Sequence, residues 1–252
     1  MSQPLRSVVL GEVGSTNVEA LARAAQGERG PLWIVARRQT AGRGRSGRVW
    51  ASEPGNLYAS LLLEVHCPPA VVPQLSLLAG VATVEAIAEA GGGMLRGLRL
   101  KWPNDVLLGQ AKCAGILAES LTNPASVIAV IGIGINLAWH PRDLSRAATN
   151  LAAHGVSITP EAMLGALDGA MQRWLSVWND GTGFARVRAA WLERAGPVGE
   201  ACTVNTGTEQ IAGAFLGIDQ SGSMLLRDQQ GRQRAVTFGD VALAAAALGE
   251  TG

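Results

Sequence analysis

The segment LKWPNDVLLGQAKCAGILAES, residues 100–120, decides the fold class. Its apolar runs predict strands at 98–102, 105–108 and 112–120, and only brief turns of two and three residues separate them. Parallel neighbours need a long crossover connection, whereas antiparallel neighbours can be joined by a tight turn. The segment therefore predicts a meandering antiparallel sheet and argues against a doubly wound parallel one.

Helices and strands are grouped along the rest of the chain. Helical periodicity predicts helices at 17–26, 73–90, 160–178 and 183–195, and further strands are expected at 32–37, after a turn within 51–65, and at 127–137. Beyond Gly196 the chain changes to closely spaced strands at 201–205, 210–219, 223–227 and 233–238. We therefore predict an α+β fold, with a mixed, mainly antiparallel sheet in a domain of residues 1–196 and a small β-barrel in residues 197–252.

Composition excludes several classes of protein. The 252 residues carry a formal net charge of +1, so no global field favours DNA or a membrane, and the basic residues concentrate between 37 and 48. Three widely spaced cysteines and three scattered histidines support neither a disulfide framework nor a zinc site. The N-terminus lacks the pattern of a signal peptide, and the longest apolar stretch, 127–139, is interrupted by glycines. We expect a cytoplasmic protein.

The segment GRGRSGRVW, residues 42–50, combines three glycines with three arginines. Glycine lets the backbone approach an anion, and arginine supplies a planar fork of donors, so this loop suits a nucleotide phosphate. Salt-dependent RNA binding and a plain solvated hairpin are the alternatives for the loop alone. The locally concentrated charge favours a discrete anion site over a nucleic-acid track.

Asp105 and Lys112 are the first candidate pair for chemistry. If their strands form a hairpin, the two side chains lie near each other at one end, where lysine can hold a negative group and aspartate can accept a proton. A surface salt bridge is the structural alternative. Cys113 should point to the opposite face from Lys112, because side chains alternate along a strand.

Two further patterns have both a functional and a structural interpretation. In VIGIGINL, residues 130–137, Gly132 and Gly134 bare one face of a strand for a planar ligand or for a packed helix, with Asn136 on that same face. In GSTN, residues 14–17, hydroxyls precede a helix and suit either an N-cap or a ligand.

The motifs GSTN, QTAGRGRSGRVW, KWPNDVLL with KCAGILAES, and GIGINL occur in this order and together resemble the biotin–protein ligases. The resemblance implies a class II synthetase-like catalytic domain and a small SH3-like C-terminal barrel. It also implies ATP with Mg²⁺, attack of the biotin carboxylate on the α-phosphate to give biotinyl-AMP, and transfer of biotin to a lysine of a biotin carboxyl carrier domain. The protein would be a monomer or homodimer.

The resemblance assigns roles to individual positions. Lys112 would bridge the biotin carboxylate and the α-phosphate, Asp105 would orient or deprotonate the carrier lysine, and Arg48 would act with them on the phosphates. The biotin site would comprise Ser15, Thr16, Asn17, Gln39, Gly42, Arg43, Arg45, Trp50, Lys112, Gly115, Gly132 and Gly134. The nucleotide site would comprise Arg45, Arg48, Trp50, Asn104, Lys112 and Asn136, with phosphate contacts from Arg43 as well. No metal ligand is assigned.

Three departures from the family pattern qualify these expectations. No DNA-binding helix-turn-helix is expected before the catalytic domain, so repressor activity and DNA binding are not expected. Ser46 and Ala244 stand where many members carry basic residues, which weakens the expected phosphate contacts.

The rival enzyme is a lipoate ligase or octanoyl transferase of the same fold, and a transferase would use a cysteine such as Cys113. A non-catalytic binding module is the rival from another class.

Overall fold

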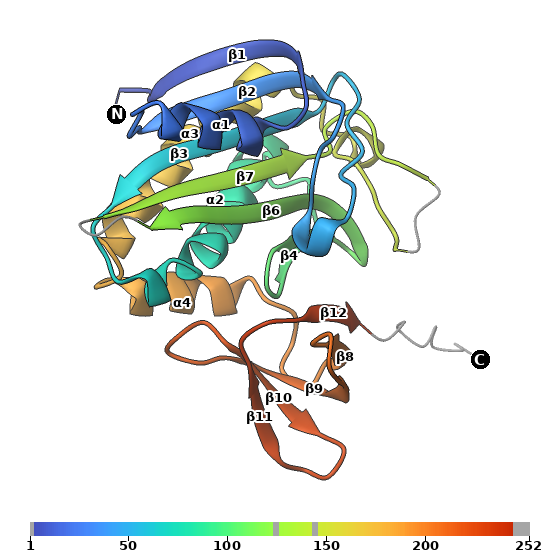
Figure 1. Ribbon diagram of the computed structural model, residues 1–252. Helices are drawn as coiled ribbons and strands as arrows, with labels where there is room; N and C mark the ends of the chain where they lie inside the picture. Colours follow the sequence, from blue (N-terminus) through green and yellow to red (C-terminus); the bar gives the residue numbers. More distant parts are fainter. Residues whose placement is uncertain (1–2, 123–125, 143–145, 244–252) are drawn as a thin grey trace.

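The computed structural model describes residues 3–122, 126–142 and 146–243 of the chain (Figure 1). A seven-stranded sheet with helices on both faces fills the upper part of the view, and a smaller sheet lies below it. The α+β class and the mixed sheet predicted from sequence are confirmed.

The larger sheet has the strand order β1-β2-β3-β7-β6-β5-β4. The predicted antiparallel meander runs through β4, β5, β6 and β7, and β3 joins it by pairing antiparallel with β7. One edge holds a strand that was not predicted, β1, and its parallel pairing with β2 across a connection that contains a helix makes the sheet mixed. The strands are β1 (Arg6–Val13), β2 (Leu32–Gln39), β3 (Leu57–Val65), β4 (Leu98–Lys101), β5 (Asp105–Leu108), β6 (Ala111–Thr122) and β7 (Val127–Ile135).

Alternation along the central strands gives the sheet two buried faces. On β2, Trp33 and Val35 join the main core, whereas Leu32 and Ile34 join a smaller cluster with the first helix. Helix α1 (Thr16–Ala25) covers part of one face, while α2 (Gln74–Gly91) and α3 (Pro160–Trp178) cover the other, and α4 (Phe184–Glu193) packs against α2 and α3 (Figure 1). Because α1 covers only part of its face, a stretch of sheet is left available for a site.

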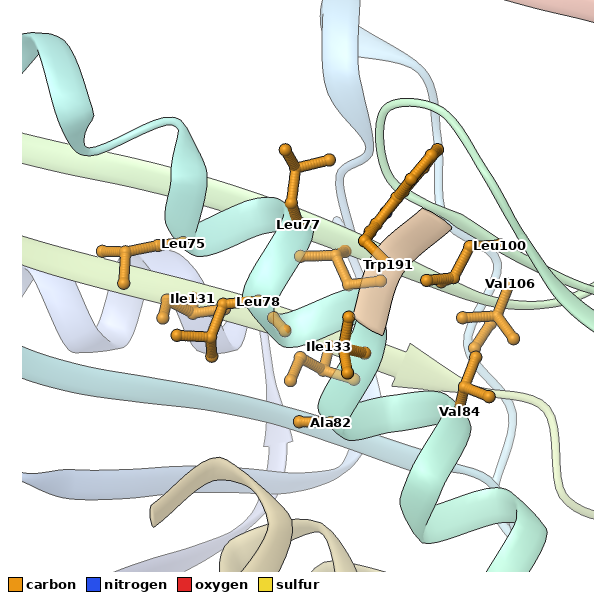
Figure 2. Packing of buried hydrophobic residues seen from close by; sticks show 14 of the residues in the cluster. Leu75, Leu77, Leu78, Ala82, Val84, Leu100, Val106, Ile131, Ile133 and Trp191 are labelled. Atoms are coloured by element: carbon orange, nitrogen blue, oxygen red, sulfur yellow. The ribbon is translucent and has the colours of Figure 1, made fainter. Parts of the chain in front are cut away.

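Helix α2 is the centre of the main core. Figure 2 shows Leu75, Leu78 and Ala82 of this helix beside Ile131 and Ile133 of β7. Each fully buried leucine or isoleucine stabilises the fold by about 1.5–3 kcal/mol. The segment Pro69–Gly91 is long and apolar enough to cross a membrane by composition, but 72% of the tested window is buried inside the fold. Its burial therefore identifies α2 as a helix of the hydrophobic core.

The five C-terminal strands form a separate antiparallel sheet in the order β11-β10-β9-β8-β12. Four of them lie within two residues of their predicted bounds, and the last strand, in the segment FGDVAL, was not given bounds from sequence. Closure into an SH3-like barrel stays a prediction. The strands are β8 (Ala201–Asn205), β9 (Gln210–Ile218), β10 (Met224–Asp228), β11 (Gln233–Val236) and β12 (Asp240–Leu243).

Candidate functional site

A cavity of about 280 Å³ lies over the part of the sheet face that α1 leaves open. The even-numbered residues of β7 lie on the cavity side of the sheet, because the odd-numbered residues from Val127 to Ile135 are buried in the main core. Of these, Gly132 and Gly134 line the cavity, whereas Ile128 and Val130 are buried in the cluster with α1. Of the residues predicted for the site, all but Gly42 line this cavity. The predicted residues that line it are Ser15, Thr16, Asn17, Gln39, Arg43, Arg45, Arg48, Trp50, Asn104, Asp105, Lys112, Gly115, Gly132, Gly134 and Asn136.

Asp105 lies between two lysines at one end of the cavity. Its Oδ1 is 2.5 Å from Nζ of Lys112, and its Oδ2 is 2.8 Å from Nζ of Lys101. Burial opposes ionisation of Asp105, but the two ammonium groups outweigh it and hold the pKa of this carboxyl far below its usual range. Burial lowers the pKa of Lys101. Asp105 is therefore ionised and holds Lys112 in place, which favours an orienting role over proton abstraction.

A β-bulge explains how Lys112 and Gly115 share one face of β6. They are three residues apart, so regular alternation would place them on opposite faces. The register between β5 and β6 shifts between Val106 and Leu107, and Cys113 and Ala114 are both buried in the core. A Cβ added at Gly115 would lie 2.9 Å from Nζ of Lys112, which confirms that both positions face the cavity. Cys113 points away from Lys112, as predicted.

The two glycines of β7 serve different neighbours. A Cβ at Gly132 would lie 2.2 Å from Oδ1 of Asn17, so this glycine admits a side chain of α1. A Cβ at Gly134 would lie 2.6 Å from Cε2 of Trp50, whose indole covers this part of the floor. The helix-packing interpretation is therefore right at Gly132, whereas a planar ligand beside Gly134 stays a prediction.

The polar end of the cavity is built at the start of α1. Gln39 accepts hydrogen bonds through Oε1 from the backbone N–H of Thr16, at 2.9 Å, and donates through Nε2 to Ser52, at 3.2 Å. Ser15 occupies the N-cap position, but its hydroxyl makes no capping hydrogen bond, so of the two alternatives for this side chain the N-cap is wrong. The Ser15 side chain lines the cavity instead of turning back over the first turn.

The arginine loop, residues 42–50, contacts both sheets. Arg43 lies 3.5 Å from a carboxylate oxygen of Glu119 on β6. Arg45 donates to the carbonyl of Gly239 at 3.2 Å, and Arg48 forms an ion pair with Asp240 at the start of β12. The loop arginines thus face carboxylate and carbonyl oxygens, which are the kind of acceptor that a phosphate also presents.

Trp50 ends the loop inside the cavity. Its ring centroid is 5.2 Å from Nζ of Lys112, a cation–π distance. Its Nε1 is buried and has no hydrogen-bond partner within the described part of the chain. Gly42 permits this arrangement, because a Cβ there would lie 2.5 Å from the carbonyl oxygen of Trp50. Gly42 therefore shapes the loop from behind the cavity wall.

The two asparagines of the predicted nucleotide site stabilise the strands around Lys112. Asn104 donates to the carbonyl of Ile116 at 2.6 Å, and Asn136 donates to the carbonyl of Thr149 at 3.0 Å. The backbone N–H of Thr149 in turn donates to the carbonyl of Lys112 at 2.9 Å. Asn136 thus fixes the segment that continues the sheet beside Lys112.

Several residues near the site were not predicted from sequence. Lys101 lies within the quoted KWPND motif, so its charge was a usable signal. Ser60, Glu119 and Asp240 carried no such signal, because only the tertiary fold brings them to the site. Ala244, expected to weaken a nucleotide contact, lies outside the described residues.

Among the residues with described positions, no group of three His, Cys, Asp or Glu side chains is placed to bind a metal ion. The cavity carboxylates Asp105 and Asp240 are each occupied by cationic side chains. These residues therefore do not fit a dedicated metal site.

Known proteins resemble this chain over almost its whole length. Residues 15–136 match the Biotin/lipoate A/B protein ligase family, and residues 198–243 match the Biotin protein ligase C terminal domain. A Biotin–[acetyl-CoA-carboxylase] ligase of Paracoccus denitrificans is 42% identical over 232 residues, covering 89% of this chain and 95% of that protein. The enzyme of that name from Mycobacterium tuberculosis is 33% identical and covers 92% and 87%.

A solved structure shares the fold described above. A biotin protein ligase from Aquifex aeolicus in complex with biotin and ATP superposes with a TM-score of 0.78 at 28% identity, covering 96% of this chain and 99% of that one.

Proposed function

Because this chain belongs to the biotin protein ligase family, we propose that its cavity joins biotin to AMP and then passes biotin to a lysine of a carrier protein. The observation that carries the proposal is the position of Lys112, held by Asp105 and facing the indole of Trp50 beside the arginine loop. This arrangement gathers positive charge where a carboxylate and a phosphate must approach each other.

The first step forms a mixed anhydride. A carboxylate oxygen of biotin attacks the α-phosphorus of ATP, the bond from that phosphorus to the bridging oxygen breaks, and pyrophosphate leaves. Lys112 stabilises the charge shared by the two reacting groups, while Arg43, Arg45 and Arg48 bind phosphate oxygens. Trp50 packs on the ligand, and its unpartnered Nε1 offers it a hydrogen bond.

The second step transfers biotin to the carrier. The lysine amine attacks the acyl carbon of biotinyl-AMP, AMP leaves with the bonding electron pair, and the amine loses a proton. Asp105 holds the approaching ammonium or amine by charge and hydrogen bonding, because its low pKa makes it a weak proton acceptor. The acceptor we propose is a biotin carboxyl carrier domain of a carboxylase, as the relatives' names indicate for those proteins.

Mg²⁺ belongs to the proposal as a companion of ATP. Since the cavity carboxylates are paired with cations, the phosphate oxygens of ATP would supply the ligands of the ion. The free state of all three cysteines agrees with a reducing, cytoplasmic location.

A lipoate ligase or octanoyl transferase is the less supported alternative. A transferase needs a nucleophilic thiolate, but Cys113 is fully buried in the core and burial raises its pKa to about 12. Cys113→Ala should leave activity unchanged, whereas a transferase would lose it.

Pyrophosphate release tests the proposal directly. Purified protein is incubated with ATP and biotin, lipoate or octanoate, beside the Lys112→Ala and Cys113→Ala variants. Release with biotin alone, lost in Lys112→Ala and kept in Cys113→Ala, is the expected result. Release with lipoate or octanoate in preference to biotin would transfer the assignment to a lipoate ligase. A transferase takes its acyl group from a thioester without ATP, so it would release pyrophosphate with none of the three acids.

A further inference from the structure

A chain of polar side chains runs behind the polar end of the cavity: Thr16, Asn17 and Ser60 are buried, and Glu119 is partly exposed. Glu119 of β6 contacts Asn17, Asn17 contacts Ser60 of β3, and Ser60 contacts Thr16. Thr16 and Asn17 line the cavity, whereas Ser60 is completely buried and Glu119 lies outside the lining. The chain therefore connects a charged group behind the wall to a hydroxyl in the wall.

The neighbours of Asn17 fix the direction of its amide. Nδ2 lies 2.7 Å from Oε2 of Glu119 and 3.2 Å from the carbonyl oxygen of Leu117, both of which only accept hydrogen bonds. Turning the amide over would place its oxygen against a carboxylate and a carbonyl. The amide oxygen of Asn17 must therefore face Ser60, whose Oγ lies 2.6 Å away.

Counting protons then sets the direction of the two hydroxyls. Ser60 has one hydroxyl proton, and the oxygen of Asn17 can only accept it. The geometry of the 2.7 Å contact between Ser60 and Thr16 has Ser60 as its donor, but Ser60 cannot give one proton to both Thr16 and Asn17. With that proton on Asn17, the contact takes its proton from Thr16. The competing contact from the Thr16 hydroxyl to Oε1 of Gln39 is longer, at 3.2 Å.

This proton order leaves two acceptors side by side in the cavity wall. The hydroxyl oxygen of Thr16 and Oε1 of Gln39 lie 3.2 Å apart without a proton between them. Both oxygens belong to residues that line the cavity. A ligand group that donates a hydrogen bond fits this place, and a group that only accepts is repelled.

We propose that Glu119 and Ser60 are positioning residues that turn the Thr16 hydroxyl away from the cavity, so that the wall selects a ligand with an N–H at this point. The inference rests on the proposed function, since the ureido ring of biotin carries N–H groups and the heads of lipoate and octanoate carry none. Arg43 pairs with Glu119 across 3.5 Å.

The test compares biotin with its two cyclic carbamate analogues, in each of which one ring N–H is replaced by oxygen. Each ligand is titrated calorimetrically without ATP into wild-type protein, Ser60→Ala, Glu119→Met and Glu119→Gln. Thr83→Val is the matched control, because Thr83 also has a buried hydroxyl, bonded to the carbonyl of Ala79 in α2 on the other face of the sheet.

Wild-type protein should bind biotin about a hundredfold more tightly than the carbamate that lacks the facing N–H, since a site built for a donor rejects an analogue without it. In Ser60→Ala the Thr16 hydroxyl is free to turn, so biotin affinity should fall about tenfold and the preference should shrink to about tenfold or less. Glu119→Met should shift the preference in the same direction, Glu119→Gln should restore it because an acceptor remains, and the control should match wild type.

Each result decides the matter. An unchanged preference for biotin over the carbamate in Ser60→Ala and Glu119→Met, or an equal loss of affinity for both ligands, would overturn the positioning role of Ser60 and Glu119. The ligase function would stay intact. If Ser60→Ala does not fold, the two Glu119 variants decide alone. Wild-type protein that binds no biotin would overturn the proposed function and, with it, the positioning role of Ser60 and Glu119.

Discussion

The ammonium of Lys112 and the carboxylate of Asp105 meet at the end of the cavity, with Nζ 2.5 Å from Oδ1. Because the compact ammonium also lies 5.2 Å from the centroid of the Trp50 ring, a planar guanidinium does not fit the same place. Lys112→Arg should therefore lower the rate of biotinyl-AMP formation about a hundredfold despite its positive charge. Stopped-flow measurement of adenylate formation checks this, and near-normal rates would contradict the geometric role of Lys112.

Asp105→Asn should lower the free energy of unfolding at pH 7 by about 3 kcal/mol, because it leaves two ammonium groups without their counter-charge. The folded pKa of Asp105 is depressed, so its stabilisation is complete above the unfolded pKa of about 4 and is lost as pH falls below it. Denaturant titrations from pH 7 to pH 2 should show the gap to wild type narrowing below pH 4. Glu209→Gln, which disrupts an exposed ion pair with Arg234, serves as control. A gap that widens on acidification would reverse the assigned sign.

Gly134→Ala should weaken ligand binding, because the new Cβ would lie 2.6 Å from the Trp50 ring and displace the indole from the sheet. Biotin titration should show an affinity loss of about tenfold or more. Gly165→Ala in α3, which meets no atom within 4 Å, should bind normally and gain about 0.5–1 kcal/mol in stability. Equal binding by both variants would show that the Trp50 position is not needed.

Arg48→Ala should raise the KM for ATP about tenfold, because one charged donor to the phosphates is lost. The ion pair with Asp240 is lost as well, so amide exchange in β12 should become faster. Arg38→Ala removes an exposed arginine paired with Glu12 and should change neither quantity. An unchanged KM for ATP in Arg48→Ala would remove Arg48 from the nucleotide site.

The sequence sufficed for the parts of the site that depend on local order. The hairpin predicted between the strands of Asp105 and Lys112 brings these two side chains together, and alternation correctly separates Cys113 from Lys112. The bulge that brings Gly115 to the face of Lys112 was not predictable, because it depends on the pairing register of β5 and β6.

Residues that join the site from distant strands could not be predicted from the sequence either. Ser60 and Glu119 meet Asn17 only because β3, β7 and β6 are neighbours in the sheet. The expected cap at Ser15 failed because a hydroxyl before a helix is equally suited to a cavity, and tertiary structure decided between the two.

The pairing of Lys101 and Lys112 with Asp105 has a consequence for the protein's own chemistry. These are the only two lysines in the sequence, and every other member of its 21 basic lysine and arginine side chains is an arginine. An acyl adenylate that escapes the cavity modifies exposed amines but not guanidinium groups, so the described surface offers it no free lysine. The protein should therefore resist acylation of its own side chains during long incubation with biotin and ATP. Mass spectrometry should find no biotin on either lysine, whereas an exposed lysine introduced by Arg234→Lys should become labelled.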